Sequence, residues 1–295
     1  MEEAVFKLKD KRSLSYALYG SRQHVPVLYF HGTPSSRLEP LLVNQYGIDL
    51  EASLQAAGLL LIAVDRPGMG FSTFNPRGNY RSFADDVYQL CQHLQISSCP
   101  VLCWSGGGPY ALAIASCYPA LITSVHIIAG FTRPFDREVS QQMGLNKWYF
   151  WAARYVPGLQ RLIMNLLRRH TIKRAVPRKF TGLSWEDYRL LNTGPLLNAM
   201  AGVSMKQAAR LGAKGPVYEA RNYFRPFGFS LKQVLQPVHY WWGTKDQVII
   251  RLHPEALEQH LPHPVMHYRE GEGHLSIYVN CFHDILGNIR FTLAQ

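Results

Sequence analysis

Residues 99–118 read CPVLCWSGGGPYALAIASCY and hold, in order, a strand, a sharp turn and a helix. The apolar run 100–104 has the length and composition of a buried strand. Ser105 comes at the turn, and the Ala- and Leu-rich residues after Pro109 favour a helix. A serine in this setting is typical of a nucleophile elbow, in which a strained turn holds the hydroxyl clear of the sheet.

An elbow needs small residues two positions before and two positions after its nucleophile, so that strand and helix can approach each other closely. Gly107 meets this requirement after Ser105, and Cys103 stands before it, where glycine is commoner. The alternative is that Ser105 is only the N-cap of a helix weakened by glycines. The rest of the chain decides between these two interpretations.

The composition predicts one large α/β domain with an insertion. The chain has 295 residues, of which 47% are hydrophobic, enough for a sizeable core. Residues 1–3 open a charged N-terminus unlike a signal peptide, and no run of about 18 apolar residues predicts a membrane span. We therefore expect a cytoplasmic protein with five free thiols, which form no CxxC pair: Cys91, Cys99, Cys103, Cys117 and Cys281.

The positive charge is concentrated in one segment. The net charge is +11, and residues 131–236 alone hold 18 Lys and Arg against 5 Asp and Glu. Such a field attracts anions, anionic lipid surfaces or nucleic acid, and a solvated basic face that aids solubility is an equally good interpretation. No nucleic-acid-binding motif accompanies the charge, so nucleic acid is not expected as a partner.

Strands and helices alternate through most of the chain. This alternation predicts a mostly parallel sheet with helices on both faces. Eight strands are expected, at residues 4–9, 13–19, 25–30, 59–64, 100–104, 123–130, 237–242 and 265–269. Helices are expected at 36–57, 80–95, from 109 onward, at 254–261 and at 275–293.

Residues 131–230 interrupt the alternation. They are rich in Trp, Tyr, Lys and Arg and carry a helical pattern broken by Pro and Gly. We expect a core made of residues 1–130 and 231–295, with an inserted helical cap at 131–230. An insertion at the catalytic rim of a sheet is naturally a lid.

Several polar residues follow the ends of expected strands. His31, Asp65 and Ser105 each come directly after one, so we expect them on one rim of the sheet, where such sheets bind their ligands. Asp65 and Arg66 are expected to brace the loop beneath the site as an ion pair. His31 is expected to support the loop rather than to take part in the chemistry.

Five short motifs occur in the order typical of one family. They are HGTP at 31–34, DRPGMGFS at 65–72, WSGG at 104–107, WGTKD at 242–246 and GH at 273–274. The chain therefore resembles the α/β-hydrolases with a helical cap, over nearly its full length. This resemblance implies an eight-stranded, mostly parallel α/β-hydrolase sheet with helices on both faces and an inserted cap.

Three side chains predict a serine-hydrolase triad. A serine hydroxyl needs a base within hydrogen-bond reach, and His274, after the last strand, can take the proton of Ser105 and later return it to the leaving group. Asp246 would fix the imidazole tautomer and stabilise the imidazolium. The chain order Ser, Asp, His is the one this fold uses.

His274 competes with other histidines of the same region. It is preferred because it follows a glycine between a strand and the terminal helix. A metal site in this histidine-rich stretch is a weaker alternative, since the spacings fit no standard ligand pattern, and we expect neither a metal nor a cofactor. The competing residues are His253, His260, His263, His267 and His283.

The oxyanion formed on attack needs preorganised donors. The Gly106 N–H supplies one, as the residue after the nucleophile, and the resemblance to HGxP loops implies the Thr33 N–H as the other. Gly32 allows the backbone to turn tightly there. Gly32 and Trp104 are expected in the wall of the substrate pocket.

The serine at the elbow limits the chemistry. Haloalkane dehalogenases and epoxide hydrolases of this fold carry an aspartate there, so the resemblance leaves acyl transfer to water. We expect a serine hydrolase that cleaves a small or medium carboxylic ester through an acyl-enzyme on Ser105. A C–C or amide bond hydrolase with the same triad is the alternative enzyme. A non-catalytic small-molecule receptor or a peripheral membrane module is the alternative of another class.

The basic segment bears on the substrate. Five carboxylates against 18 cations within residues 131–236 argue against a cationic substrate and favour an ester with an acidic or phosphate-bearing part. Residues 147–174 mix aromatic with basic residues and resemble an interfacial helix pair, which predicts weak contact with an anionic membrane. The favoured interpretation is an ordinary cap that packs its apolar face over the site.

Overall fold

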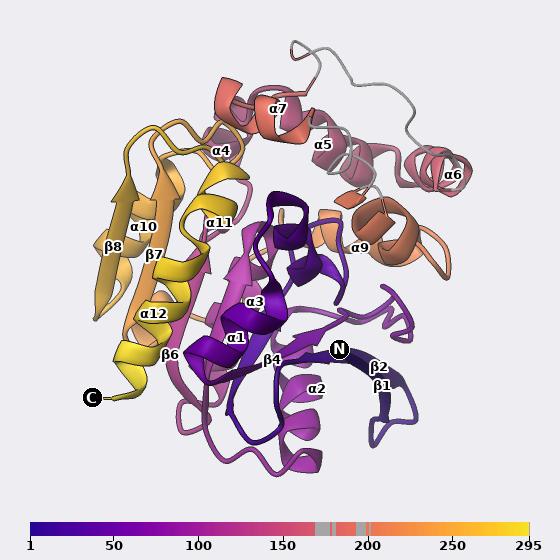
Figure 1. Ribbon diagram of the computed structural model, residues 1–295. Helices are drawn as coiled ribbons and strands as arrows, with labels where there is room; N and C mark the ends of the chain where they lie inside the picture. Colours follow the sequence, from indigo (N-terminus) through magenta and orange to yellow (C-terminus); the bar gives the residue numbers. More distant parts are fainter. Residues whose placement is uncertain (169–177, 179–180, 193–198, 201, 295) are drawn as a thin grey trace.

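A sheet of eight strands forms the centre of the computed structural model, which describes residues 1–168, 178, 181–192, 199–200 and 202–294 (Figure 1). The strand order is β1-β2-β4-β3-β5-β6-β7-β8. Strand β2 runs antiparallel to β1 and β4, and the other neighbours are parallel, which confirms the predicted sheet. The strands are β1 (Glu2–Lys7), β2 (Ser13–Tyr19), β3 (Val25–Phe30), β4 (Leu59–Val64), β5 (Cys99–Trp104), β6 (Ile122–Ile128), β7 (Val238–Gly243) and β8 (Pro264–Arg269).

The run LLLIAV makes β4 a strand that is buried along its whole length. Parallel sheets produce such continuous apolar runs because helices cover both of their faces. Strand β3 pairs with β4 in parallel, with Val25 opposite Leu59 and Phe30 opposite Val64. The residues that follow these two strands therefore leave the sheet at the same edge.

The connections place helices on both faces. From β3 the chain passes through α1 (Leu50–Ala57) to β4 in one direction along the sheet. It then passes through α2 (Tyr80–His93) to β5 and through α3 (Gly108–Cys117) to β6 in the other direction. Right-handed crossovers in opposite directions lie on opposite faces. Accordingly, α1 packs with α12 (Phe282–Leu293), in front of the sheet in Figure 1, and α2 packs with α3. The direction changes between β3 and β5, where sheets of this kind bind ligands.

Two predicted helices are each divided in two. The stretch 36–57 forms the 3₁₀-helix η1 (Glu39–Tyr46) and then α1, because Gly47 ends the first with a φ of 74° and Asp49 caps the second. The stretch 275–293 forms α11 (Ser276–Asn280) and α12, with a turn at Cys281. The remaining core helix, α10 (Leu252–His260), lies at the predicted place.

The described part of the segment between β6 and β7 consists of helices and loops. In Figure 1 its longer helices lie along the edge toward which the parallel strands point. The boundaries of the cap, at 131 and 230, stay a prediction. Within the described residues we find no helix with the length and hydropathy of a membrane span. The helices that the structure describes in this segment are α4 (Arg137–Gln142), η3 (Gly144–Asn146), α5 (Lys147–Tyr155), α6 (Pro157–Leu167), α7 (Trp185–Leu191), η5 (Gly202–Ala208), α9 (Lys214–Asn222) and η6 (Leu231–Gln233).

Candidate active site

Ser105 lies in the sharp turn between β5 and α3. Its φ is 52°, in the left-handed region that residues other than glycine rarely adopt. A Cβ at Gly107 would lie 2.9 Å from Cys103 Cβ and closer still to the Phe30 carbonyl oxygen. The small residues at 103 and 107 thus let β5 and α3 meet closely, as an elbow requires.

The structure brings three predicted residues into one hydrogen-bonded chain. His274 Nε2 lies 3.1 Å from Ser105 Oγ, and His274 Nδ1 lies 3.0 Å from Asp246 Oδ2. All three residues are buried. Burial alone would lower the pKa of His274, but the charge of Asp246 and its hydrogen bond outweigh burial and raise that pKa above 6.5. The imidazole is therefore placed to exchange a proton with the serine hydroxyl.

Asp246 is held from two sides. Its Oδ1 accepts hydrogen bonds from Val248 N at 2.7 Å and Ile249 N at 2.8 Å, while Oδ2 faces His274. The turn after β7 thus fixes the carboxylate through one oxygen. The other oxygen is free to orient the imidazole.

The other histidines of this region lie in different surroundings. His253 is buried and its Nδ1 accepts a hydrogen bond from a backbone N–H, whereas His267 Nε2 lies 3.1 Å from His239 Nδ1. His260 Nδ1 lies 2.9 Å from the Ala256 carbonyl oxygen of its own helix, α10, and His283 Nε2 lies 3.1 Å from Ser53 Oγ of α1. The described residues hold no group of three His, Cys, Asp or Glu side chains that could bind a metal ion.

The loop after β3 carries Gly32 and Thr33 to the nucleophile. A Cβ on Gly32 would lie 3.4 Å from Ser105 Cβ. A Cβ on Gly106 would lie 2.5 Å from Tyr223 Oη and closer still to Thr33 Oγ1. The structure thus brings together Thr33 and Gly106, the residues predicted to supply the oxyanion donors.

A buried carboxylate that sequence reasoning missed, Glu39, holds this loop. Its two oxygens accept from Gly32 N at 2.8 and 3.0 Å, and Oε1 also accepts from Tyr29 Oη at 2.7 Å. Burial raises the pKa of Glu39 to about 7, against the lowering effect of its hydrogen bonds. Because Glu39 occupies the Gly32 N–H, this group is not free for an oxyanion, and the Thr33 N–H stays the predicted donor.

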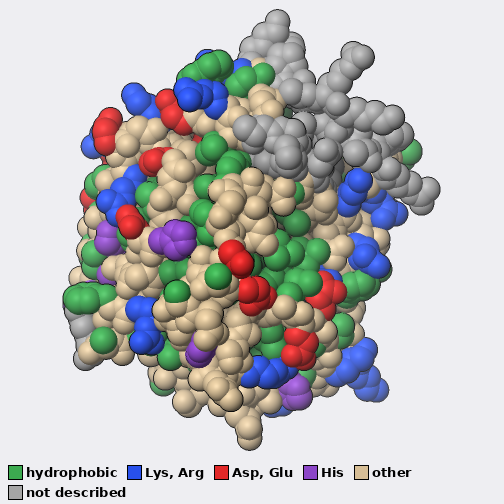
Figure 2. Space-filling model, in the orientation of Figure 1, with side chains coloured by type: hydrophobic (Ala, Val, Ile, Leu, Met, Phe, Trp, Pro, Cys, Tyr) green, Lys and Arg blue, Asp and Glu red, His purple; other side chains and the backbone are tan. Residues whose placement is uncertain are grey.

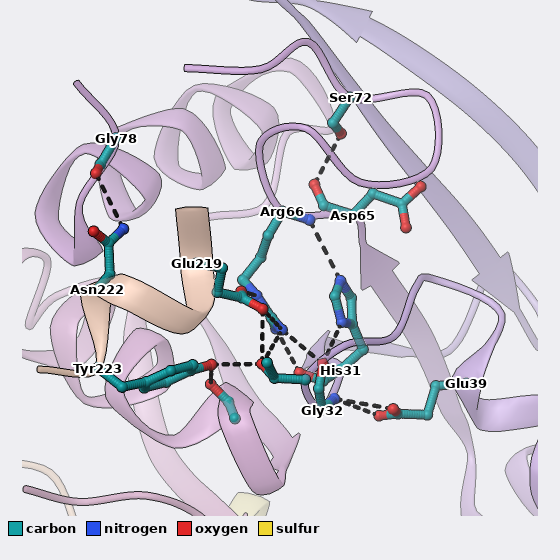
Figure 3. Close-up of polar contacts among 12 residues, drawn as sticks. His31, Gly32, Glu39, Asp65, Arg66, Ser72, Gly78, Glu219, Asn222 and Tyr223 are labelled. Atoms are coloured by element: carbon teal, nitrogen blue, oxygen red, sulfur yellow. Dashed lines mark hydrogen bonds and ion pairs between the residues drawn. The ribbon is translucent and has the colours of Figure 1, made fainter. Parts of the chain in front are cut away.

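Arg66 is buried in the middle of this network (Figure 3). Its guanidinium pairs with Glu219, donates to the His31 carbonyl oxygen and donates through Nη2 to the Gly32 carbonyl oxygen at 2.7 Å. His31 itself is buried, and its Nδ1 lies 2.8 Å from the same Gly32 oxygen. Burial, with the charge of Arg66, holds the pKa of His31 well below 6.5. Through these contacts His31 supports the loop after β3.

The predicted ion pair between Asp65 and Arg66 is wrong. Asp65 pairs instead with Arg37, at 2.7 Å between Oδ2 and Nη1, and also accepts from Ser15 Oγ at 2.7 Å. Consecutive residues of an extended chain point to opposite sides. Asp65 therefore faces Arg37, whereas Arg66 faces the loop after β3.

Helix α9 reaches the same loop with two side chains four residues apart (Figure 3). Glu219 Oε2 accepts from Thr33 Oγ1 at 2.7 Å. Tyr223, at the C-terminal end of α9, donates from its hydroxyl to the Gly106 carbonyl oxygen at 2.8 Å, and this hydroxyl also lies 2.5 Å from Thr33 Oγ1. Residues this far apart lie on one face of a helix. The inserted segment thus holds both sides of the predicted oxyanion site.

Helix α7 supplies a second carboxylate near His274. Asp187 is fully buried and accepts from three backbone N–H groups, those of His274 at 2.7 Å, Leu275 at 2.8 Å and Ser276 at 2.9 Å. Gly273 makes room for it, because a Cβ there would lie 2.5 Å from Asp187 Cγ. No local signal reveals this contact, since 87 residues separate the carboxylate from His274.

Trp104 packs beneath the imidazole. Its Nε1 donates to the His274 carbonyl oxygen at 3.2 Å, and its ring lies 5.3 Å from the imidazole ring and 4.9 Å from the Tyr278 ring. These contacts support the base from below. The expected place of Trp104 in the pocket wall stays a prediction.

The chain is similar to known proteins over most of its length. Residues 25–280 match a protein family described as "alpha/beta hydrolase fold". The uncharacterized hydrolase YcgS of Bacillus subtilis (strain 168) is 21% identical over 272 residues, which cover 90% of this chain and 89% of that protein. A structure from a study of carboxylesterases of Nitrososphaera gargenis aligns with a TM-score of 0.71 at 15% identity, over 99% of both chains. The esterase RhEst1 of Rhodococcus sp. ECU1013 aligns with a TM-score of 0.70 at 19% identity, over 100% of this chain and 99% of that one.

The likeness to the two solved structures is one of fold. The family match spans most of the chain and includes the loop after β3, the turn with Ser105 and the loop that carries His274. It confirms the predicted family and the prediction of a hydrolase. The chain belongs to the alpha/beta hydrolase fold family.

Proposed function

We propose that this hydrolase is a serine carboxylesterase that forms an acyl-enzyme on Ser105. One feature supports this above all: the buried chain from Ser105 Oγ through His274 to Asp246, with both contacts near 3 Å. Nucleophile and base within this distance, with the base oriented by a third group, are the signature of an activated serine. Two solved structures of similar fold carry esterase or carboxylesterase in their descriptions.

In the proposed mechanism, His274 Nε2 takes the hydroxyl proton while Ser105 Oγ bonds to the ester carbonyl carbon. The carbonyl oxygen becomes an oxyanion, which accepts hydrogen bonds from the Thr33 and Gly106 N–H groups. The C–O bond to the alcohol then breaks, and His274 gives its proton to the departing oxygen. A water molecule repeats the sequence on the acyl-enzyme, and the carboxylic acid leaves.

The excess of Lys and Arg in residues 131–236 favours an ester whose acyl or alcohol part is acidic. A pair of p-nitrophenyl esters of equal chain length, one ending in methyl and one in carboxylate, tests this. We expect the higher kcat/KM for the carboxylate, and the preference should fall as salt is added. A constant preference for the methyl ester contradicts an acidic substrate.

A fluorophosphonate probe tests the nucleophile. We expect the wild-type chain to be labelled and Ser105→Ala to be unlabelled, with kcat on p-nitrophenyl esters lowered about 10⁴-fold or more. Hydrolysis of matched amides and of a diketone, at rates above those of the esters, would instead favour an amide or C–C bond hydrolase. No labelling of folded wild-type protein, together with tight ligand binding that Ser105→Ala retains, would favour a receptor.

A further inference from the structure

Helix α6 carries an apolar stripe on its outer face. The stripe consists of Leu159, Leu162, Ile163, Leu166 and Leu167, whose exposed fractions lie between 45% and 59%. Their spacing of three and one residues places them on one side of a helix. Gln160 and Met164, beside the stripe on the helix, are buried against the molecule. Folded monomers rarely leave so many large apolar residues together in water, so the stripe calls for a partner.

Aromatic residues of α5 extend this apolar surface. Trp148 and Tyr155 are exposed, and Trp151 lies between them, with ring centroids 5.6 Å from Trp148 and 6.2 Å from Tyr155. Rings with an apolar body and a polar tip suit a boundary between water and hydrocarbon. We call these three residues, together with the stripe, the α5–α6 face.

The charged residues of α5 and α6, and Arg168 at the end of α6, are all cations, and Arg168 Nη1 donates to the Ala209 and Arg210 carbonyl oxygens and so faces the molecule. Residues 147–168 contain Lys147, Arg154, Arg161 and Arg168 and neither Asp nor Glu. Lys147 Nζ lies 5.5 Å from the centres of the Trp148 and Trp151 rings, so this cation stands among the aromatic residues. In Figure 2, Lys and Arg side chains gather at the right edge of the molecule, in the region where Figure 1 has α9 and the loop before α9.

We propose that the α5–α6 face docks on an anionic lipid bilayer. Apolar side chains flanked by cations, with aromatic residues at the boundary, match the hydrocarbon, headgroups and interface of such a surface. The stems of Lys and Arg can lie along the apolar region while their charges reach the phosphates.

Other occupants fit this face less well. In a two-fold dimer the same surface meets itself, which would bring the cations of one copy against those of the other. Nucleic acid would pair with the cations but would leave the five apolar residues of the stripe in water. A bilayer that contains anionic lipid satisfies both features at once.

Docking would hold the candidate active site close to the lipid. Helices α5 and α6 both pack against α9, the helix that carries Glu219 and leads into Tyr223. The docking face is thus one helix away from the predicted oxyanion site. The proposal rests on the surface alone and does not depend on the proposed ester chemistry.

Cosedimentation of the full chain with vesicles tests the proposal, using phosphatidylcholine alone and phosphatidylcholine mixed with phosphatidylserine. We expect binding to the mixed vesicles and weaker binding to the neutral ones, with salt reducing the difference. The double variant Leu162→Gln, Leu166→Gln should lower the partition coefficient about tenfold. Arg154→Gln with Arg161→Gln should lower binding to the mixed vesicles alone.

Leu235 and Phe291 provide the matched control, because they are as exposed as the stripe and lie outside α5 and α6. We expect Leu235→Gln with Phe291→Gln to bind as wild type does. Thermal unfolding and fluorophosphonate labelling check that each variant is folded. Three results would overturn the proposal: wild type that stays with the supernatant, stripe variants that bind undiminished, or a wild-type dimer in solution that the stripe variants abolish. Vesicle binding by the wild-type chain without any fluorophosphonate labelling would support the docking proposal and contradict the proposed esterase activity.

Discussion

One carboxylate oxygen of Asp246 faces His274 Nδ1, and the other accepts hydrogen bonds from the turn after β7. We expect Asp246→Asn to lower kcat about 10⁴-fold, because the imidazole loses the group that fixes its tautomer. A base must be neutral to work, so kcat/KM rises with pH through the pKa of His274. That pKa is held above 6.5 by Asp246, so the variant's acid limb should move to lower pH. A pH–rate profile measures both effects, and an unmoved limb would contradict this role.

Gly106 is a residue at which one added methyl group should impair both catalysis and stability. A Cβ there would collide with Thr33 Oγ1 and Tyr223 Oη, so Gly106→Ala should displace the loop after β3. We expect kcat/KM to fall at least about tenfold and the free energy of unfolding to fall by about 1–3 kcal/mol. Gly287→Ala is the control, because α12 leaves open space at that position. It should keep activity and gain up to about 1 kcal/mol of stability.

Residues of the candidate site were predictable where they follow a strand within a motif. Ser105, Asp246 and His274 do so, and the parallel sheet brings their strand ends to one edge. Glu219 lies 153 residues from Arg66, and no local pattern pairs them. Glu39 lies near Gly32 in the sequence, but a carboxylate at the start of a helix is ordinarily solvent-exposed, so its burial was not foreseeable.

Helix α7 connects the inserted segment to the loop that carries His274 through Asp187, which accepts from three backbone N–H groups there. Asp187→Ala would leave three buried N–H groups without their acceptor, and we expect the free energy of unfolding to fall by about 1–3 kcal/mol. The nearby negative charge also favours the protonated form of His274, so its loss should lower the pKa of His274 and move the acid limb of kcat/KM to lower pH. Chemical denaturation and pH–rate profiles measure these effects.

Glu186→Ala is the matched control for Asp187, since it removes the neighbouring carboxylate of the same helix. We expect wild-type stability and an unchanged acid limb for it. If Asp187→Ala lowers stability but leaves the limb in place, Asp187 only holds the fold and does not position the base.

The elements themselves were predictable to different degrees. Strands such as β4 are buried on both faces and read as unbroken apolar runs. Helix ends depend on capping residues. Gly47 ends η1, and Asp49, two residues later, caps the start of α1. A pattern with helical spacing spans both helices, which explains why 36–57 resembled one.

At the scale of the whole molecule, buried histidines should make the fold sensitive to mild acid. Burial lowers the pKa of His239 to about 4 and that of His253 to about 3, from 6.5. Between these values and 6.5 the unfolded chain binds protons that the folded chain does not, so stability falls as pH falls. Each such histidine contributes up to about 1.4 kcal/mol per pH unit.

Urea unfolding at about pH 7 and about pH 5 measures this loss of stability. His253→Gln keeps an acceptor for the Thr132 N–H but cannot take up a proton. We expect its free energy of unfolding to depend less on pH than that of wild type, whatever its absolute stability. If the free energy of unfolding of the variant depends on pH as strongly as that of wild type, groups other than His253 cause the acid sensitivity.

The buried pair of Arg66 and Glu219 also limits how the insertion can move. Lifting α9 away would leave the Arg66 guanidinium uncompensated inside the molecule, at a cost of about 3–5 kcal/mol. At equilibrium, fewer than about one molecule in a hundred would then have α9 raised. Substrate binding through such a rare form would be weakened by the same factor, so the insertion is better described as fixed over the site than as a lid that opens. Substrate would reach Ser105 around α9 and not through its displacement.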